Sequence, residues 1–245
     1  VTKKEIEEYL KKTQTQGKLD TPFLVSAIVS TYNSEKFIRG CLEDLTAQTL
    51  YKKGQLEIII VNTGSLQNEE CVIKEFQTCY ANIEYIKTPD RKTMYQAWNI
   101  GVKAARGRYI TNANTDDRHR ADAMEVLAGK LDDNPDIDLV YGDCYATDTP
   151  NETWRENNKT PLYRYPDFLP ASAVLFYQFG PQPMWRKTVH EKIGYFSENL
   201  KACGDYDFNL RFATRLKALH IRQPLGLYLP RPGRLRSGCD GNILF

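Results

Sequence analysis

The sequence lacks long hydrophobic runs and an excess of either charge. Its longest apolar stretches, such as residues 23–29 and 58–61, have the length of buried strands, whereas a membrane span needs roughly 20 residues. Lys and Arg number 33 against 31 Asp and Glu among 245 residues, which leaves a formal net charge of +2. Such a surface has no strongly basic field to hold nucleic acid through its phosphates. We therefore expect neither a membrane-spanning helix nor a nucleic-acid partner.

Cysteine and histidine are scarce and scattered. The six cysteines form no C-x-x-C pair and no zinc-ligand cluster with histidine, which favours reduced thiols in a cytoplasmic protein. The three histidines, His119, His190 and His220, do not have the spacing of a ligand set or a Ser-His-Asp unit. We interpret each of them as a surface or packing residue.

The common phosphate-binding motifs are also missing. There is no G-x-x-x-x-G-K-[ST] sequence and no G-x-G-x-x-G after the first predicted strand, which argues against kinases, P-loop NTPases and nicotinamide dehydrogenases. A nucleotidyltransferase would need a glycine-rich basic loop after the same strand. Residues 30–35 read Ser-Thr-Tyr-Asn-Ser-Glu and do not form such a loop, which argues against this class as well.

What the sequence does contain is a repeated strand, polar turn and helix. The predicted strands are residues 23–29, 56–61, 83–86 and 108–111, and the predicted helices are residues 35–48, a segment ending near 79, 93–105 and 121–131. This alternation predicts an α/β fold with a doubly wound, mostly parallel sheet. A short amphipathic helix is predicted over residues 2–12.

The second half of the chain follows a different pattern. After an apolar segment at residues 137–141, residues 149–183 are rich in proline and aromatic side chains. Short helices are predicted at residues 188–192 and 206–217, and residues 219–241 read as a basic tail broken by prolines. We expect an irregular region with a function different from that of the first half.

Polar turns follow three of the predicted strands. They are residues 31–33 (Thr-Tyr-Asn), 62–65 (Asn-Thr-Gly-Ser) and 112–117 (Asn-Ala-Asn-Thr-Asp-Asp). The carboxyl ends of parallel strands lie along one edge of the sheet, where open α/β sheets bind ligands. The sequence therefore predicts one crevice lined by hydroxyls, amides and two carboxylates.

Asp116 and Asp117 are candidate metal ligands. Adjacent carboxylates repel each other unless they share a cation, and Mg²⁺ or Mn²⁺ is typically held by one or two carboxylates together with substrate phosphates. A nucleotide diphosphate would supply those phosphates. The alternative is that the pair only caps the helix predicted near Ala121.

A second acidic cluster, residues 203–207 (Cys-Gly-Asp-Tyr-Asp), lies at the start of a predicted helix. A carboxylate there can simply cap the helix and interact with its dipole. The alternative is a general base, Asp205, that takes a proton from an attacking hydroxyl.

Five segments together resemble the family 2 glycosyltransferases of GT-A fold. They are residues 25–35 (VSAIVSTYNSE), 59–65 (IIVNTGS), 97–110 (AWNIG followed by ARGRYI), 114–117 (NTDD) and 204–211 (GDYDFNLR). Their order and spacing agree over about residues 22–237. The Thr-Asp-Asp and Gly-Asp variants are also similar to the branch that includes the spore-coat polysaccharide transferase SpsA.

The resemblance implies an inverting transfer of a sugar from a nucleotide-diphosphate donor, usually a uridine one, with Mn²⁺ or Mg²⁺ as cofactor. The acceptor would be a hydroxyl on a glycan, a lipid-linked or a protein-linked molecule. The implied donor contacts are Thr31, Tyr32, Asn33, Asn62, Thr63, Asn114 and Asp116, the metal ligands Asp116 and Asp117, and the general base Asp205. Two residues in the aromatic stretch, Gln182 and Trp185, are candidate acceptor contacts.

The resemblance also implies a division of the chain. Residues 1–20 would form an N-terminal helix and linker, about 21–147 a Rossmann-like donor half and about 148–237 an acceptor half. Residues 238–245 would be a tail, which could be the cut end of a longer chain. The basic tail also allows a peripheral contact with the inner face of a membrane.

The chain departs from the family pattern at three places. Asn62 and Thr63 stand where relatives usually have two aspartates, which leaves the preferred base of the donor open. Asn114 occupies the first acidic position of the D-x-D pattern and is a poorer metal ligand. Residues 228–233 read Tyr-Leu-Pro-Arg-Pro-Gly where many relatives have a Tyr-Arg-x-His segment. Arg231 or Arg234 could instead pair with the diphosphate, and Arg91 and Lys92 are further candidates. A nucleotide-sugar-binding module without catalysis is therefore the alternative function.

Overall fold

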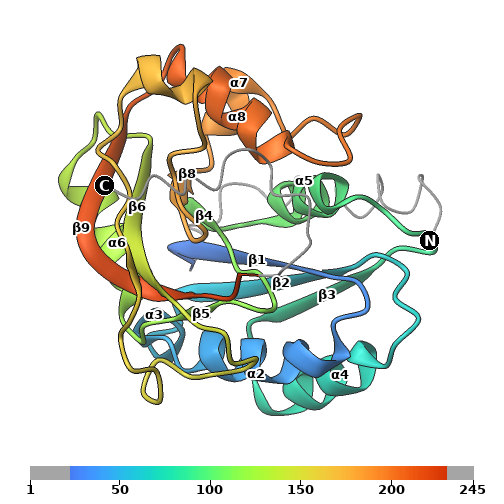
Figure 1. Ribbon diagram of the computed structural model, residues 1–245. Coiled ribbons are helices and arrows are strands. Elements are labelled where there is room, and N and C mark those ends of the chain that lie inside the picture. The colour runs from blue at the N-terminus through green and yellow to red at the C-terminus, as the bar shows by residue number, and fades with distance from the viewer. Residues whose placement is uncertain (1–22, 231–245) are drawn as a thin grey trace.

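The computed structural model describes residues 23–230. Figure 1 shows a central curved sheet between two groups of helices. The predicted helix at residues 2–12, Arg231, Arg234 and the tail at residues 238–245 lie outside the described residues.

Four parallel strands form the first half of the sheet. They are β1 (Val25–Thr31), β2 (Leu56–Asn62), β3 (Ile83–Lys87) and β4 (Tyr109–Asn112), in the spatial order β3-β2-β1-β4. β1 and β2 are rich in Val and Ile and almost wholly buried, as expected for parallel strands covered on both faces. The predicted mostly parallel sheet is confirmed.

Helices cover both faces of these strands. α2 (Glu35–Thr46) and α4 (Glu69–Cys79) lie on one face and α5 (Met94–Ala104) on the other (Figure 1). α3 (Thr49–Lys52) and α6 (Ala123–Asp133) contact each other, and α3 also contacts α2. α5 begins with a capping box. The Thr93 hydroxyl accepts a hydrogen bond from the Gln96 backbone N–H, and the Gln96 side chain accepts one from the Thr93 backbone N–H.

The sheet continues with strands from the second half of the chain. The order runs from β4 through β8 (Met184–Arg186), β6 (Leu139–Ala146) and β9 (Ala218–Tyr228) to β5 (Arg118–His119), and β7 (Leu162–Tyr163) pairs with β6. β8 is antiparallel to both β4 and β6, whereas β6 and β9 are parallel. The remaining elements are η1 (Pro170–Val174), α7 (Val189–Ile193) and α8 (Gly204–Ala213).

The prediction for residues 219–241 was wrong over its described part. Residues 218–228 form the strand β9, although Pro224 lies within it. The ladder with β6 shifts register on either side of Asp143, the partner of Pro224, and such a bulge accommodates a residue that has no N–H to donate. The helix predicted at 206–217 is α8, which begins at Gly204 and ends at Ala213.

Two hydrophobic clusters pack against the sheet. In β2, Ile58 and Ile60 belong to a cluster of mostly aliphatic residues, which we call the aliphatic core, whereas Ile59 and Val61 belong to the other cluster. That second cluster is rich in aromatic rings, and we call it the aromatic core. Its rings come from the following residues: Tyr95, Trp98, Tyr141, Phe179, Trp185, Phe196, Phe208 and Phe212. The alternation follows from the period of two along a strand.

Within residues 23–230 no helix has both the length and the apolar character required to cross a bilayer. The cysteines in this part of the chain, Cys41, Cys71, Cys79, Cys144 and Cys203, are all free thiols.

Candidate active site

The three predicted polar turns meet at one edge of the sheet. Thr31 and Asn62 are the last residues of β1 and β2 and lie opposite each other, and Asn112 ends β4 beside β1. The crevice expected at the carboxyl ends of these parallel strands therefore exists as an arrangement of strand ends.

A buried glutamate joins the first two turns. Glu69, on the first turn of α4, is fully buried. Its carboxylate accepts from the Ser34 backbone N–H at 2.7 Å, from the Ser65 hydroxyl at 2.6 Å and from the Thr31 hydroxyl at 3.3 Å. Sequence reasoning missed Glu69, and the available signal was an acidic residue four positions after Ser65 at a helix start.

The second turn has another internal support, Asn33. Its backbone is left-handed, with φ 50°, and its Oδ1 accepts from the Leu66 backbone N–H at 3.1 Å and from Ser65 Oγ at 3.2 Å. Tyr32 is half-buried, and the Arg91 guanidinium lies over its ring at 4.2 Å from the centroid. Tyr32 and Arg91 thus form a cationic and aromatic surface beside the strand ends.

Neutral groups occupy the end of β2. Asn62 donates to the Tyr85 hydroxyl at 3.1 Å and accepts from the Ser65 backbone N–H at 2.9 Å. The hydroxyl of buried Thr63 donates to the Thr31 carbonyl at 3.4 Å. Gly64 has φ +70°, and a Cβ there would lie 3.1 Å from the Arg91 backbone nitrogen, so the close approach of the two loops favours glycine.

The acidic turn holds one carboxylate inside the protein. Asp117 is buried, and its carboxylate accepts from the Asn114 side chain at 2.9 Å and from the Leu229 backbone N–H at 3.3 Å. Burial, followed by the negative charge of neighbouring Asp116, raises the pKa of Asp117 well above its usual range. Asp116 itself is half-buried.

The neighbouring cation, Arg118, holds the acidic turn through its backbone. Its guanidinium donates to the backbone carbonyls of Thr115 at 2.9 Å and Asp117 at 2.6 Å, and to Asn151 Oδ1 at 2.6 Å. Arg118 therefore fixes the backbone that carries the two carboxylates.

This donor set fits a hard divalent cation. Adjacent carboxylates, one of them buried, need positive charge, and Mg²⁺ or Mn²⁺ takes one or two carboxylates with water and phosphate oxygens as further ligands. Within residues 23–230 no group of three or more His, Cys, Asp and Glu side chains gathers as a metal site. The residues that could hold the ion are thus Asp116 and Asp117.

Asp205 lies on the first turn of α8, next to the end of β4. Its Oδ1 accepts from the Tyr95 hydroxyl and from the Tyr206 backbone N–H, both at 3.0 Å. Asp205 and Asn112 line the same small pocket, whose other walls are mainly aromatic. The Oδ1 atom of Asn112 is buried and has no hydrogen-bond partner. The pocket therefore brings the Asp205 carboxylate and the Asn112 amide into one lining with aromatic rings.

The two candidate acceptor residues are internal. Trp185 is 1% exposed on β8, and its indole N–H donates to His190 Nε2 at 2.9 Å. The Gln182 amide donates to the Arg118 carbonyl at 2.9 Å. Trp185 lines the same small pocket as Asp205, whereas Gln182 ties distant chain segments together. Both positions stay predictions as acceptor contacts.

A cleft of about 600 Å³ opens beside the strand ends. Asn33 from the first turn and Leu229, which donates to Asp117, both line it, together with residues of α2 and the loop at Asp148 and Pro150. This volume lies within the range of small-molecule sites. Of the predicted donor contacts, Asn33 reaches this cleft.

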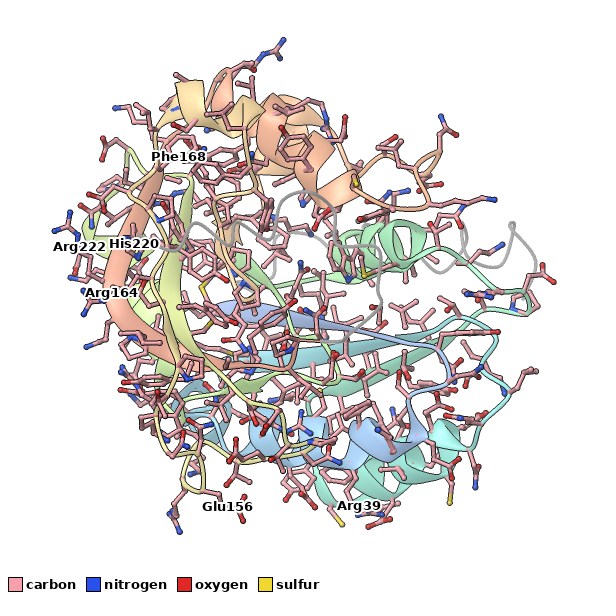
Figure 2. The ribbon with its side chains drawn as sticks, in the orientation of Figure 1. Arg39, Glu156, Arg164, Phe168, His220 and Arg222 are labelled. Atoms are coloured by element: carbon pink, nitrogen blue, oxygen red, sulfur yellow. The ribbon has the colours of Figure 1, made fainter. Side chains whose placement is uncertain are left out.

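All three histidines are packing or bridging residues in the structure. His119 is buried against Asp44 at 2.8 Å, and His190 lies in the aromatic core. The ring of His220, on β9 (Figure 2), links Asp143 and Asp167 at 2.8 and 3.1 Å and stacks on Tyr141.

Comparisons with known proteins identify the family and the fold. The family described as Glycosyl transferase family 2 matches residues 26–197. A glycosyltransferase of Methanocaldococcus jannaschii, MJ1057, whose name calls it uncharacterized, is 29% identical over 196 residues, covering 80% of this chain and 66% of the relative. The chain thus spans just under two thirds of that relative.

Solved structures show the same fold. Residues 1–349 of Staphylococcus aureus TarS in complex with UDP-GlcNAc superpose with a TM-score of 0.70 at 19% identity, over 86% of this chain and 59% of that one. The mannosyltransferase PcManGT of Pyrobaculum calidifontis, in complex with GDP-Man and Mn²⁺, superposes with a TM-score of 0.65 at 15% identity. The match covers 93% of this chain and 66% of PcManGT. On the match to the family and on this GT-A fold, the chain belongs to glycosyl transferase family 2.

Proposed function

We propose that the protein transfers a sugar from a nucleotide-diphosphate donor to a hydroxyl acceptor, with inversion at the anomeric carbon. Asp116 and Asp117 would hold a divalent cation, and Asp205 would be the general base. UDP-sugars are the first donors to test. The acceptor would be a hydroxyl of a glycan or of a lipid-linked or protein-linked molecule.

One observation carries the proposal. The end of β4 contributes to both chemical centres, since Asn112 lines the Asp205 pocket and the acidic turn with Asp116 and Asp117 follows directly. A donor whose diphosphate contacts the acidic turn could therefore present its sugar toward Asp205. A single displacement requires this opposition of leaving group and base.

The chemistry assigned to this arrangement is one step. The acceptor oxygen forms a bond to the anomeric carbon while the bond from that carbon to the diphosphate oxygen breaks. The bonding electrons leave with the nucleoside diphosphate, and the acceptor proton passes to the Asp205 carboxylate. Attack from the face opposite the leaving group inverts the anomeric centre.

The proposed cation would neutralise charge on the departing diphosphate. Asp117, held by Asn114 and the Leu229 backbone N–H, would provide a fixed ligand, and Asp116 a second, more exposed one. The Mn²⁺ present with PcManGT supports testing this metal first.

The nucleoside would lie against the β1 and β2 turns. Tyr32 with Arg91 over its ring offers a stacking surface, and Thr63 and Asn62 offer neutral hydrogen-bonding groups. The similar structures are of TarS in complex with UDP-GlcNAc and of PcManGT in complex with GDP-Man. Both nucleotides therefore belong in the test.

Thermal unfolding with nucleotides tests the donor site. The protein would be melted with UDP, UDP-GlcNAc, GDP and GDP-mannose, each with and without Mn²⁺, and Asp117→Ala would be measured in parallel. A ligand at 100 times its Kd stabilises the native state by about 2.7 kcal/mol, which corresponds to roughly 5 °C or more for a chain of this size. We expect such a shift with one base, dependent on Mn²⁺ and lost in Asp117→Ala.

The outcomes separate the candidate functions. No shift with any nucleotide would overturn the donor-site assignment. A metal-dependent shift without release of nucleoside diphosphate, with water or with a panel of sugar and lipid-linked acceptors, would favour the non-catalytic binding module instead.

A further inference from the structure

One oxygen of Asp205 is held from two sides. Oδ1 accepts from the Tyr95 hydroxyl at 3.0 Å and from the Tyr206 backbone N–H at 3.0 Å. Within residues 23–230, the hydrogen bonds made by the Asp205 carboxylate all go to this oxygen. The second oxygen, Oδ2, is thereby left to interact with a ligand.

The Tyr95 ring is fixed by its surroundings. Tyr95 is 2% exposed, stacks on Phe196 at 6.3 Å between centroids and meets Trp98 edge to face at 5.5 Å. It occupies the first turn of α5, and Asn99 of the same helix exchanges two hydrogen bonds with the Phe196 backbone, at 2.9 and 3.0 Å. The hydroxyl is therefore presented by a rigid aromatic body.

The loop that carries Asp205 is shaped around this ring. A Cβ at Gly204 would lie 2.7 Å from Cδ2 and Cε2 of Tyr95, so only glycine lets the loop approach so closely. Cys203, which precedes it, is left-handed with φ 61°. The backbone thus takes an unusual conformation at the point where Asp205 meets Tyr95.

The Tyr95 hydroxyl is a donor over the whole working pH range. Burial, followed by the charge of Asp205, raises the pKa of Tyr95 well above its usual value. Tyr95 therefore keeps its proton, and its hydroxyl stays available as a hydrogen-bond donor to Asp205 Oδ1.

We propose that Tyr95 is a positioning residue for the general base: it holds Oδ1 so that Oδ2 is the atom that accepts the proton. This inference rests on the proposed function of Asp205. Tyr95 itself touches neither donor nor acceptor in this account, so its loss should lower the rate of transfer more than the binding of the donor.

Other groups near Asp205 are not placed to take this role. Tyr177 lines the same pocket, and Cys203 and Asp207 flank Asp205 along the chain, where Asp207 pairs with Arg211 at 2.7 Å. α8 packs against η1, which carries no titratable side chain, and against α7. The titratable residues of α7 are His190, which packs on the Phe208 ring, Glu191, and Lys192, which pairs with Asp138.

The test compares Tyr95→Phe with the wild-type protein. The assay measures the release of nucleoside diphosphate between pH 5 and 9, with the nucleotide sugar that raises the melting temperature and with water or the best acceptor. We expect kcat to fall about tenfold, because Asp205 Oδ1 loses the donor that fixes its orientation, while the KM for the donor stays within about twofold.

Tyr141→Phe is the matched control. Tyr141 also lies in the aromatic core, is also fully buried, and donates to the Pro166 carbonyl at 2.6 Å, without a contact to Asp205. It should lose about as much thermal stability as Tyr95→Phe and keep the wild-type kcat and donor KM. Melting curves establish that both variants are folded.

Each outcome has one meaning. If Asp205→Asn abolishes turnover but Tyr95→Phe keeps the wild-type kcat, or Tyr141→Phe lowers kcat equally, the role of Tyr95 is overturned and the proposed function stands. If Asp205→Asn turns over like wild type, the general base is wrong and the inference falls with it. A lower kcat at an unchanged donor KM in Tyr95→Phe alone supports the proposal.

Discussion

The two faces of the central sheet are built from different side chains. Against one face, Ile58 and Ile60 of β2 pack with Val, Leu and Ile residues in the aliphatic core. Against the other, Ile59 and Val61 pack in the aromatic core, which contains Trp98, Trp185 and several phenylalanines. The single strand β2 therefore contributes side chains to both the aliphatic core and the aromatic core.

The two cores differ in whether their side chains carry polar groups. Aliphatic side chains contribute burial and close packing, whereas Tyr and Trp carry a polar tip on a rigid apolar body. In the aromatic core these polar groups make hydrogen bonds: the Tyr95 hydroxyl donates to Asp205, and the Trp185 indole N–H donates to His190. The aliphatic core thus contributes mainly to stability, and the aromatic core also positions the proposed base.

The largest expected effect is that of Asp205→Asn at the rim of the aromatic core. Removing a general base should lower kcat by about 10²- to 10⁴-fold, because the amide cannot take up the acceptor proton. Donor binding, measured by the shift in melting temperature, should be retained. Asp207→Asn is the control, since Asp207 lies on the same turn but pairs with Arg211; an equal loss in both variants would remove the special role of Asp205.

Ile58→Ala and Ile59→Ala compare the two cores at neighbouring, fully buried positions. Each leaves a cavity and should lower the free energy of unfolding by about 4 kcal/mol, measured in urea. Ile58→Ala should keep the kcat of the folded protein. Ile59→Ala should also lower kcat several-fold, because its cluster includes Tyr95. Identical kinetics in the two variants would contradict the division between the cores.

His190 should make the stability of the protein depend on pH. Burial lowers the pKa of His190 to about 4, and the Trp185 indole, which can only donate, requires Nε2 to be unprotonated. The unfolded chain binds a proton near pH 6.5, so stability should be full above that pH and fall as the pH decreases toward 4. Between pH 7 and 4.5 the loss from this residue should be about 2 to 3 kcal/mol.

Urea unfolding at the two pH values measures this loss. His190→Gln, which does not titrate, should show a smaller decrease than the wild-type protein by that amount. If the two proteins lost stability in parallel, His190 would not be neutral in the native state.

The smallest effect belongs to the surface outside the aliphatic core. Arg39 of α2 pairs with Glu75 of α4 at 2.5 Å, but both side chains are about half exposed (Figure 2). Solvent and salt screen such a pair, so Glu75→Gln should not measurably change the melting temperature. A clear decrease would show that α2 and α4 depend on this ion pair as well as on the core beneath them.

Much of the fold was predictable because its signals are local. The β-branched runs of β1 and β2 and the helices after them identified the parallel half, and the rule for strand ends brought Thr31, Asn62 and the acidic turn to one edge. β8 and β9 were not predicted. β8 has three residues, and Pro224 interrupts the pattern of β9, so both depend on pairing with β6.

By itself, the sequence determined the alternating strands and helices, the edge where polar turns gather, and the two acidic clusters, since each of these is written in neighbouring residues. Only the tertiary structure decided which groups support them. Tyr95 and Asp205 are 110 positions apart in the sequence, and Glu69 and Thr31, which are hydrogen-bonded, are 38 positions apart. Such contacts leave no periodic pattern in the sequence, because they form only when the sheet brings distant turns together.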